Sequence, residues 1–150
     1  MTEAEQLLEA TDSVLVIDWP TREVPETLAR AGFVVVVKGG PEPDNYTAHA
    51  VREGQVVARR LGHAPDHVDL VFAYRPVSEV PAIVVLAKEV GASGVWFQSG
   101  CASNGDDDPK GCWMPEGESQ TAREIVEAAG LAYVDDTYIA DAVRQFGIQK

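Results

Sequence analysis

The stretch VDLVFAYRPVSEVPAIVVLAKEVGASGVWFQSG (Val68–Gly100) shows most clearly how the chain is organised. It begins with one nearly continuous apolar run, VDLVFAY (Val68–Tyr74), and ends with another, GVWFQSG (Gly94–Gly100). Strands buried on both faces have this composition, whereas half-exposed strands alternate. Between the runs, helical spacing predicts a helix that ends at Gly91 and carries Val80, Ile83, Ala87 and Val90 on one face. The stretch therefore predicts a strand–helix–strand unit.

The same alternation continues on both sides of this stretch. Further strands are predicted at Ser13–Asp18, Phe33–Lys38 and Leu131–Asp135, with a short edge strand at Gln55–Leu61. Helices are predicted after the N-cap residues Thr2, Thr21 and Thr121, and on the stripe Ile139, Val143 and Phe146. Strands that alternate with helices imply βαβ units. We predict one α/β domain over residues 1–150, a Rossmann-like, doubly wound and mostly parallel sheet of five or six strands with helices on both faces.

The composition excludes several classes of function. The chain has 150 residues and a net charge of −12, with 24 acidic and 12 basic residues. This charge argues against a nucleic-acid partner, because neutralising phosphates needs a positive surface. No apolar run is long enough to span a membrane, and the N-terminus lacks the apolar core of a signal peptide. We expect a cytoplasmic protein whose two cysteines are free thiols.

Three cations follow the first three long strands. In a parallel sheet, ligands bind beyond the carboxyl ends of the strands, where the strand order reverses. The segments there contain Arg22, Lys38 and Arg75, and Arg59 and Arg60 join them if the edge strand forms. Gathered at one rim, these cations suit a ligand with several phosphates. The alternative is that they pair with acidic neighbours such as Asp18 and Glu42.

No motif in the chain specifies a reaction. The first loop, Asp18–Arg22, contains no glycine, so it does not match the Gly-x-Gly-x-x-Gly turn of ordinary NAD sites. A P-loop and a Gly-x-Ser-x-Gly elbow are also missing. His49, His63 and His67 lack the spacing of a metal site and suit surface or capping roles. We therefore predict a binding protein rather than an enzyme, without catalytic or metal-ligating residues.

Val56–Gly100 resembles the stand-alone CoA-binding domain proteins, which are small Rossmann-type relatives of the nucleotide-binding domain of succinyl-CoA synthetase α-subunits. The resemblance lies in Pro65 followed by VDLV, in FAYRP (Phe72–Pro76), in Gly91-Ala92 and in WFQSG (Trp96–Gly100). After a long loop, AAGLAYVDD (Ala128–Asp136) resembles the family's final helix-to-strand passage. The family implies a Rossmann-type fold and coenzyme A as the ligand.

The resemblance also implies a site, in which the loops after the first, second and fourth sheet strands hold the phosphates and adenine. Together with the rim, it gives the candidate cofactor-binding residues Asp18, Trp19, Pro20, Thr21, Arg22, Lys38, Gly39, Gly40, Tyr74, Arg75, Pro76, Val77 and Gln98. The chain departs from the family where Asp18-Trp19-Pro20 replaces a glycine and a small hydroxyl residue, where Lys38-Gly39-Gly40 replaces Asn-Pro, and where Asp135-Asp136-Thr137 replaces Asp-Arg-Cys.

Two main hypotheses follow for the function, and a third is an enzyme whose catalytic pair would come from Tyr74, Cys101 and Asp135. The first is a protein that binds coenzyme A or acyl-CoA without catalysis, with Lys38 as the strongest single candidate. The second is a family member that has lost the ligand and acts through protein–protein contact, because its first loop is degenerate.

One long loop, Ser99–Glu118, has no predicted structure. Its ends carry Cys101 and Cys112, whose spacing matches no common zinc motif, so a solvated loop with free thiols is expected. Trp113 and Met114 are expected to pack on their own domain, with a lid over the cleft or a contact in a homodimer as alternatives.

Overall fold

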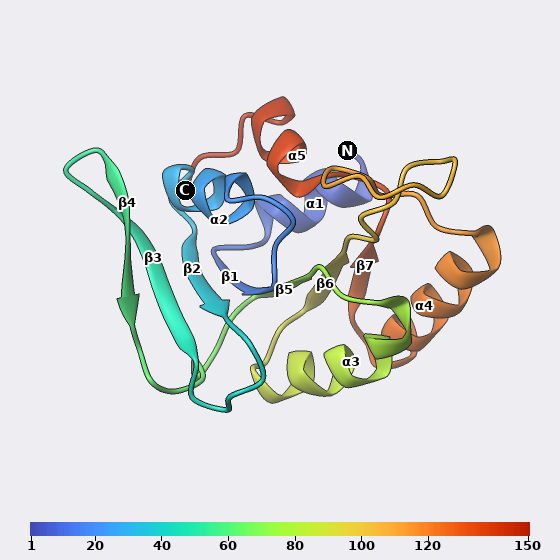
Figure 1. Ribbon diagram of the computed structural model, residues 1–150, viewed down its shortest axis with the longest axis horizontal. Coiled ribbons are helices and arrows are strands. Elements are labelled where there is room, and N and C mark those ends of the chain that lie inside the picture. The colour runs from blue at the N-terminus through green and yellow to red at the C-terminus, as the bar shows by residue number, and fades with distance from the viewer.

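The computed structural model describes all 150 residues and contains one seven-stranded sheet with helices on both sides (Figure 1). The strands are β1 Ser13–Ile17, β2 Val34–Lys38, β3 Tyr46–Arg52, β4 Gln55–Arg60, β5 Leu70–Ala73, β6 Gly94–Phe97 and β7 Ala132–Val134. The helices are α1 Glu3–Glu9, α2 Glu23–Arg30, α3 Val80–Glu89, α4 Glu116–Ala128 and α5 Ile139–Gln145, and a 3-10 turn at Val77–Glu79 precedes α3. No helix combines the length and apolar composition that crossing a membrane requires.

The strand order is β4-β3-β2-β1-β5-β6-β7. All pairs from β2 to β7 are parallel, and only β2–β3 and β3–β4 are antiparallel. The chain moves from β1 outward to β2 on one side, and from β5 outward to β6 and β7 on the other. The strand order therefore reverses between β1 and β5, which places the expected binding position at their carboxyl ends. The predicted doubly wound, mostly parallel architecture is confirmed, but the sheet has seven strands rather than the predicted five or six.

The core consists of two layers separated by the sheet. Helices α1, α2 and α5 cover one face, and α3 and α4 cover the other (Figure 1). Because successive strand residues point to opposite faces, Val14 and Val16 pack in the first layer while Leu15 packs in the second. The same alternation places Phe72 and Trp96 under the first group of helices. Burial on both sides explains why the central strands are apolar throughout.

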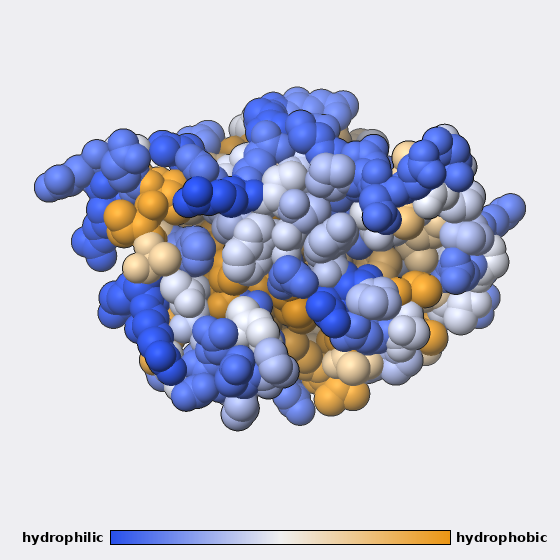
Figure 2. Space-filling model, viewed as in Figure 1, coloured by the Kyte–Doolittle hydropathy of each residue, from blue (hydrophilic) through white to orange (hydrophobic).

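The antiparallel hairpin β3–β4 extends beyond this two-layer core. The predicted edge strand is confirmed as β4, whereas β3 was not predicted, because YTAHAVR lacks a run of large apolar residues. Pairing with β2 on one side and β4 on the other holds β3 in the sheet. Figure 2 shows apolar residues over the hairpin, where Val51 and Val57 are exposed among hydrophilic neighbours.

Two of the three predicted helix caps are wrong. Thr2 does cap α1, and its Oγ1 accepts a hydrogen bond from the Glu5 amide at 3.1 Å. Helix α2 begins at Glu23, and the Thr21 hydroxyl instead pairs with the Tyr138 hydroxyl at 2.8 Å. Helix α4 begins five residues before Thr121, whose hydroxyl donates to the Gly117 carbonyl within the helix. In both cases the threonine hydroxyl forms a hydrogen bond with a group outside the predicted cap motif.

Candidate functional site

A cleft of about 500 Å³ lies at the carboxyl ends of β1, β2 and β5, where the strand order reverses. We call it cleft A. Its floor and one wall are apolar, from Ile17 on β1 and from Ile83 and Leu86 on α3, and Figure 2 shows this apolar hollow between the β2–β3 loop and α3. The polar groups that line it come from the ends of three strands and from the turn before α3: Asp18, Lys38, Arg75 and Glu79. Cleft A therefore joins an apolar surface to a rim of charges.

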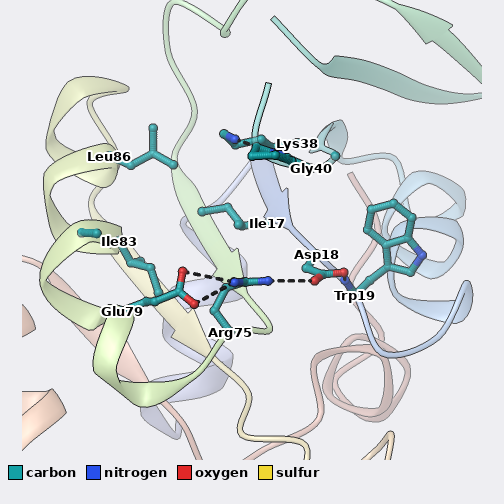
Figure 3. Close-up of a pocket in the computed structure, with 12 residues that line it drawn as sticks. Ile17, Asp18, Trp19, Lys38, Gly40, Arg75, Glu79, Ile83 and Leu86 are labelled. Atoms are coloured by element: carbon teal, nitrogen blue, oxygen red, sulfur yellow. Dashed lines mark hydrogen bonds and ion pairs between the residues drawn. The ribbon is translucent and has the colours of Figure 1, made fainter. Parts of the chain in front are cut away.

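Arg75 is held between two carboxylates in cleft A (Figure 3). Its Nη2 donates to Glu79 Oε2 at 2.8 Å, its Nε donates to both Glu79 oxygens, and its Nη1 donates to Asp18 Oδ2 at 3.3 Å. The hydrogen bonds from Arg75 to Glu79, supported by Asp18, raise the pKa of the guanidinium. Glu79 was not anticipated, although its position four residues after Arg75 is a common spacing for ion pairs.

Lys38 is the cation of cleft A that has no carboxylate partner. It ends β2, and its Nζ donates to the Gly40 carbonyl at 3.0 Å and lies 5.9 Å from the centre of the Tyr46 ring. None of the ion pairs in the structure involves it. Gly39 and Gly40 continue the same rim, and Gly40 has a φ of +68°. This side of the cleft therefore offers a positive charge beside two glycines, with the side chain of Asn45 next to Gly39 and the carboxylate of Glu42 next to Gly40.

Asp18 directly follows β1 and has an unusual backbone conformation. Its φ is +62°, in the left-handed region that residues with a Cβ adopt at an energetic cost, although aspartate tolerates it better than most. Its Oδ1 accepts a hydrogen bond from the Trp19 amide at 3.0 Å, and its Oδ2 faces Arg75. The side chain is 51% exposed. A carboxylate therefore stands at the centre of the site, where it opposes the approach of a phosphate.

A second cleft, of about 440 Å³, adjoins cleft A. We call it cleft B. It shares Asp18 and Arg75 with cleft A and continues past Tyr74 toward the long loop after β6. Trp113 and Met114 of that loop line it, and Met114 also packs on the core layer beneath α3 and α4. The expected packing of Met114 on its own domain is confirmed, while Trp113 remains 43% exposed.

The three predicted cations do not share one cleft. Arg22 lines a third cleft, of about 480 Å³, between α2 and the β3–β4 hairpin, and only Trp19 is common to it and cleft A. Arg59 and Arg60 lie on the outermost strand and line none of the three clefts, and Arg60 pairs with Asp44 at 3.6 Å. These cations reach the same edge of the sheet as Lys38, but β3 lies between β4 and β2 and places them to the side of cleft A.

The remaining predicted residues divide into three groups. Trp19, Gly39 and Gly40 line cleft A, and Tyr74, Pro76 and Val77 line cleft B. Pro20, Thr21 and Gln98 line none of the three clefts. Gln98 is fully buried and holds the long loop, because its Nε2 donates to the Pro109 carbonyl at 2.9 Å and to the Gly111 carbonyl at 3.3 Å. Gln98 of the WFQSG motif (Trp96–Gly100) therefore anchors the long loop.

The two cysteines are unbridged and lie in different surroundings. Cys101 lines cleft B, whereas Cys112 packs against the core layer beneath α1, α2 and α5. Burial, reinforced by Asp136 and Asp135, raises the pKa of the Cys112 thiol to about 12. His67 Nε2 donates to Asp69 Oδ1 at 2.9 Å, and His63 Nδ1 donates to the Ala64 carbonyl at 2.9 Å. These histidines serve local structure, as their spacing predicted.

Comparisons with known proteins identify the family and the fold of the chain. Residues 17–141 match the family model described as a CoA binding domain. Similar solved structures include Prb, a protein redesigned for binding, with a TM-score of 0.64 and 16% identity over 100% of this chain and 95% of that one. A hypothetical protein from Pyrococcus horikoshii OT3 has a TM-score of 0.61 and 17% identity, over 97% of this chain and 92% of that one.

A cell-free product from Thermus thermophilus has a TM-score of 0.58 and 19% identity, over 97% of this chain and 99% of that one. Identities this low show a shared fold alone. No curated protein matches the chain significantly. The family match covers every element from the end of β1 to the start of α5, including clefts A and B, and it supports a CoA-type ligand. On this basis the chain belongs to the CoA binding domain family.

Proposed function

We propose that this protein binds coenzyme A or an acyl-CoA at the carboxyl edge of its sheet and carries out no reaction on it. In this proposal the phosphates lie near Lys38 in cleft A, and the adenosine end approaches Gly39 and Gly40. Cleft A falls within the about 300–1,000 Å³ range of pockets that hold small ligands, with a volume of about 500 Å³. Its position at the reversal of strand order is the usual place for a nucleotide in this architecture.

The observation that carries the proposal is the unpaired charge of Lys38. A lysine that already had a carboxylate partner would have to give it up before binding a phosphate. Lys38 donates only to the Gly40 carbonyl, so a phosphate can be added with little loss. Charge-assisted hydrogen bonds of this kind are about twice as strong as neutral ones.

Arg75 supports the phosphates less directly. A guanidinium has five N–H donors, and the bonds to Glu79 and Asp18 use one on each of its three nitrogens. The donors left on Nη1 and Nη2 can face a ligand without breaking either ion pair. The two carboxylates nevertheless offset its charge, so Lys38 contributes more to affinity than Arg75 in this proposal.

The test is the affinity for coenzyme A of the Lys38→Ala variant, measured by isothermal titration calorimetry. We expect the affinity to fall about tenfold, which corresponds to about 1.4 kcal/mol. Lys88→Ala is the matched control, because Lys88 also donates to a backbone carbonyl, that of Ala129 at 2.9 Å, and lies outside both clefts. Equal affinities for the two variants would remove Lys38 from the site.

The absence of a reaction is tested separately. Acetyl-CoA incubated with the protein should release free thiol no faster than acetyl-CoA alone, as a thiol-reactive dye would report. Release above that background would assign a thioesterase or acyl-transfer activity and overturn this part of the proposal.

A second candidate function is a protein–protein contact without a nucleotide. The ion pairs of Arg75 with Asp18 and Glu79 favour it. Cleft A is lined by two carboxylates and two cations, so its charges cancel. A thermal-shift screen with CoA, acetyl-CoA, NAD, NADP and ATP separates the two candidates, since a ligand selective for the folded state raises Tm. A shift with CoA or acetyl-CoA supports the first candidate, and no shift with any nucleotide supports the second.

A further inference from the structure

Cleft B has the position and lining of a site for the thioester end of the ligand. We propose that the acyl chain of an acyl-CoA lies in cleft B, and that the protein prefers short, uncharged acyl chains to free CoA and to dicarboxylic acyl groups. This inference rests on the proposed function, since it assigns the other end of the same ligand. It makes Trp113 and Met114 determinants of acyl specificity.

Continuity of the two clefts is the first argument. Asp18 and Arg75 line both, so a ligand with its phosphates beside Lys38 can pass over Arg75 into cleft B without leaving the protein surface. Cleft B adds about 440 Å³ to the about 500 Å³ of cleft A. A long, flexible ligand that is charged at one end and apolar at the other fits this arrangement.

The walls of cleft B are the second argument. Phe97 at the end of β6 forms the buried side, and Val77 and Met114 are partly buried beside it. Trp113 lines the same cleft as Pro76 and Val77 and is 43% exposed, so a large aromatic surface faces solvent in the free protein. Each methylene that an acyl chain buries fully against such a surface strengthens binding by about fourfold.

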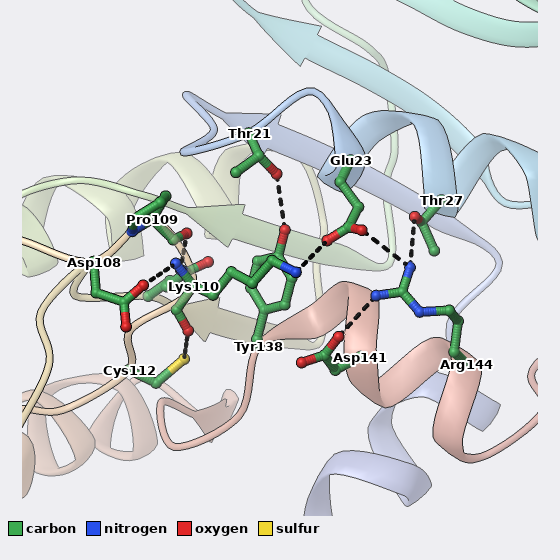
Figure 4. Close-up of polar contacts among 11 residues, drawn as sticks. Thr21, Glu23, Thr27, Asp108, Pro109, Lys110, Cys112, Tyr138, Asp141 and Arg144 are labelled. Carbon is green, nitrogen blue, oxygen red and sulfur yellow. Dashed lines mark hydrogen bonds and ion pairs between the residues drawn. The ribbon is translucent and has the colours of Figure 1, made fainter.

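The third argument is that the loop wall is already ordered. The Trp113 amide donates to the Cys101 carbonyl at 3.0 Å, and the Gly100 amide donates to the Gly111 carbonyl at 2.9 Å. An ion pair also links the loop to α2, since Lys110 Nζ lies 3.7 Å from Glu23 Oε1 (Figure 4). Binding therefore does not have to order the wall, and little affinity is lost to conformational entropy.

Charge sets the class of acyl group. Asp18 stands at the junction of the two clefts and Glu118 at the α4 side of cleft B, while Arg75 is already paired with two carboxylates. A carboxylate at the far end of an acyl chain meets like charges there, whereas a methyl end does not. Tyr74 and Ser99 supply neutral hydroxyl groups for the polar atoms of the ligand that lie next to the acyl chain.

The test is a calorimetric series with CoA, acetyl-CoA, butyryl-CoA, hexanoyl-CoA and succinyl-CoA. The wild-type protein should bind hexanoyl-CoA at least tenfold more tightly than CoA, and should bind butyryl-CoA more tightly than succinyl-CoA. In the Trp113→Ala variant the preference for hexanoyl-CoA should fall below threefold, while the affinity for CoA itself changes less than twofold. Val85→Ala is the control, because Val85 is an exposed apolar side chain on α3 outside both clefts and should leave the series unchanged.

The outcomes separate this inference from the function on which it rests. If CoA binds and Lys38→Ala weakens it, but the acyl chain adds nothing, the acyl site is overturned and the proposed function stands. If neither CoA nor any acyl-CoA binds to the wild-type protein, the proposed function fails first. Should the hexanoyl preference survive in both Trp113→Ala and a Met114→Ser variant, the loop is not the acyl wall and the inference fails.

Discussion

Asp69 and Asp18 lie at opposite ends of two neighbouring strands and differ in almost every physical respect. Asp69 comes just before β5, at the amino edge of the sheet, and accepts hydrogen bonds from the amides of Asp12 and Ser13 at 2.8 and 3.2 Å. Asp18 comes just after β1, at the carboxyl edge, has a φ of +62° and faces the two clefts.

The two edges use their carboxylates differently, and under the proposed function this difference separates stability from binding. At the amino edge, the Asp69 carboxylate accepts hydrogen bonds from His67 and from the backbone amides of Asp12 and Ser13, at the start of β1. The carboxyl edge keeps a carboxylate in a costly backbone conformation, with its charge turned toward Arg75. We expect substitutions at the first edge to change the free energy of unfolding, and substitutions at the second to change ligand affinity.

The largest effect is expected for Asp69→Ala. The variant leaves the Asp12 and Ser13 amides and His67 without their acceptor, so the free energy of unfolding should fall by about 2 kcal/mol. Urea denaturation measures this loss, and the affinity for CoA should not change. Asp66→Ala, which removes an exposed carboxylate nearby, serves as the control. A loss of CoA affinity in a folded Asp69→Ala protein would break the separation between the two edges.

A smaller effect in the opposite direction is expected for Asp18→Gly. The change relieves the positive φ and removes a carboxylate from the path of the phosphates, so the affinity for CoA should rise about tenfold, or about 1.4 kcal/mol. Glu53→Gly is a matched control, because Glu53 is also an acidic residue with positive φ, but lies at the β3–β4 turn. An equal gain in both variants would show that net charge, rather than the position of Asp18, limits binding.

The smallest effect concerns pH. Partial burial alone would raise the pKa of Asp69, but hydrogen bonds from the Asp12 amide and from His67 lower it overall. A carboxyl group with a lowered pKa in the folded state stabilises the protein fully above its ordinary pKa of about 3.9, and this contribution is lost as the pH falls toward the folded-state value. The difference in unfolding free energy between wild type and Asp69→Asn should therefore shrink below about pH 5. A difference that stays constant to pH 2 would contradict the role of the charge.

The sequence predicted most of the sheet, because buried parallel strands have a local signature. The runs at β1, β2, β5, β6 and β7 were each found within three residues of their observed ends. The missed strand, β3, has no such signature, since its stability comes from hydrogen bonds to two neighbouring strands. Caps were less predictable: Thr21 fits a cap pattern, yet its hydroxyl is taken by Tyr138, which is 117 residues away in the sequence.

The candidate site was predictable only in part. The alternation of runs predicted that Lys38 and Arg75 lie at the carboxyl ends of strands in one parallel sheet, and both line cleft A. The separation of Arg22 from them depends on where α2 and the hairpin lie, which no local pattern records. The sequence placed Trp113 in a long loop for which no structure was predicted. Its position on cleft B depends on the hydrogen bonds that fold this loop back toward β6.

The sequence alone determined the doubly wound architecture and the strand ends that carry Asp18, Lys38 and Arg75, because burial and backbone hydrogen bonding impose local patterns on the chain. Only the tertiary structure decided which charges remain available. Arg75 is clamped by an aspartate 57 residues earlier as well as by Glu79, whereas Lys38 meets no carboxylate. Pairing between side chains depends on distances of a few ångströms between distant segments, and such distances exist only after the sheet has formed.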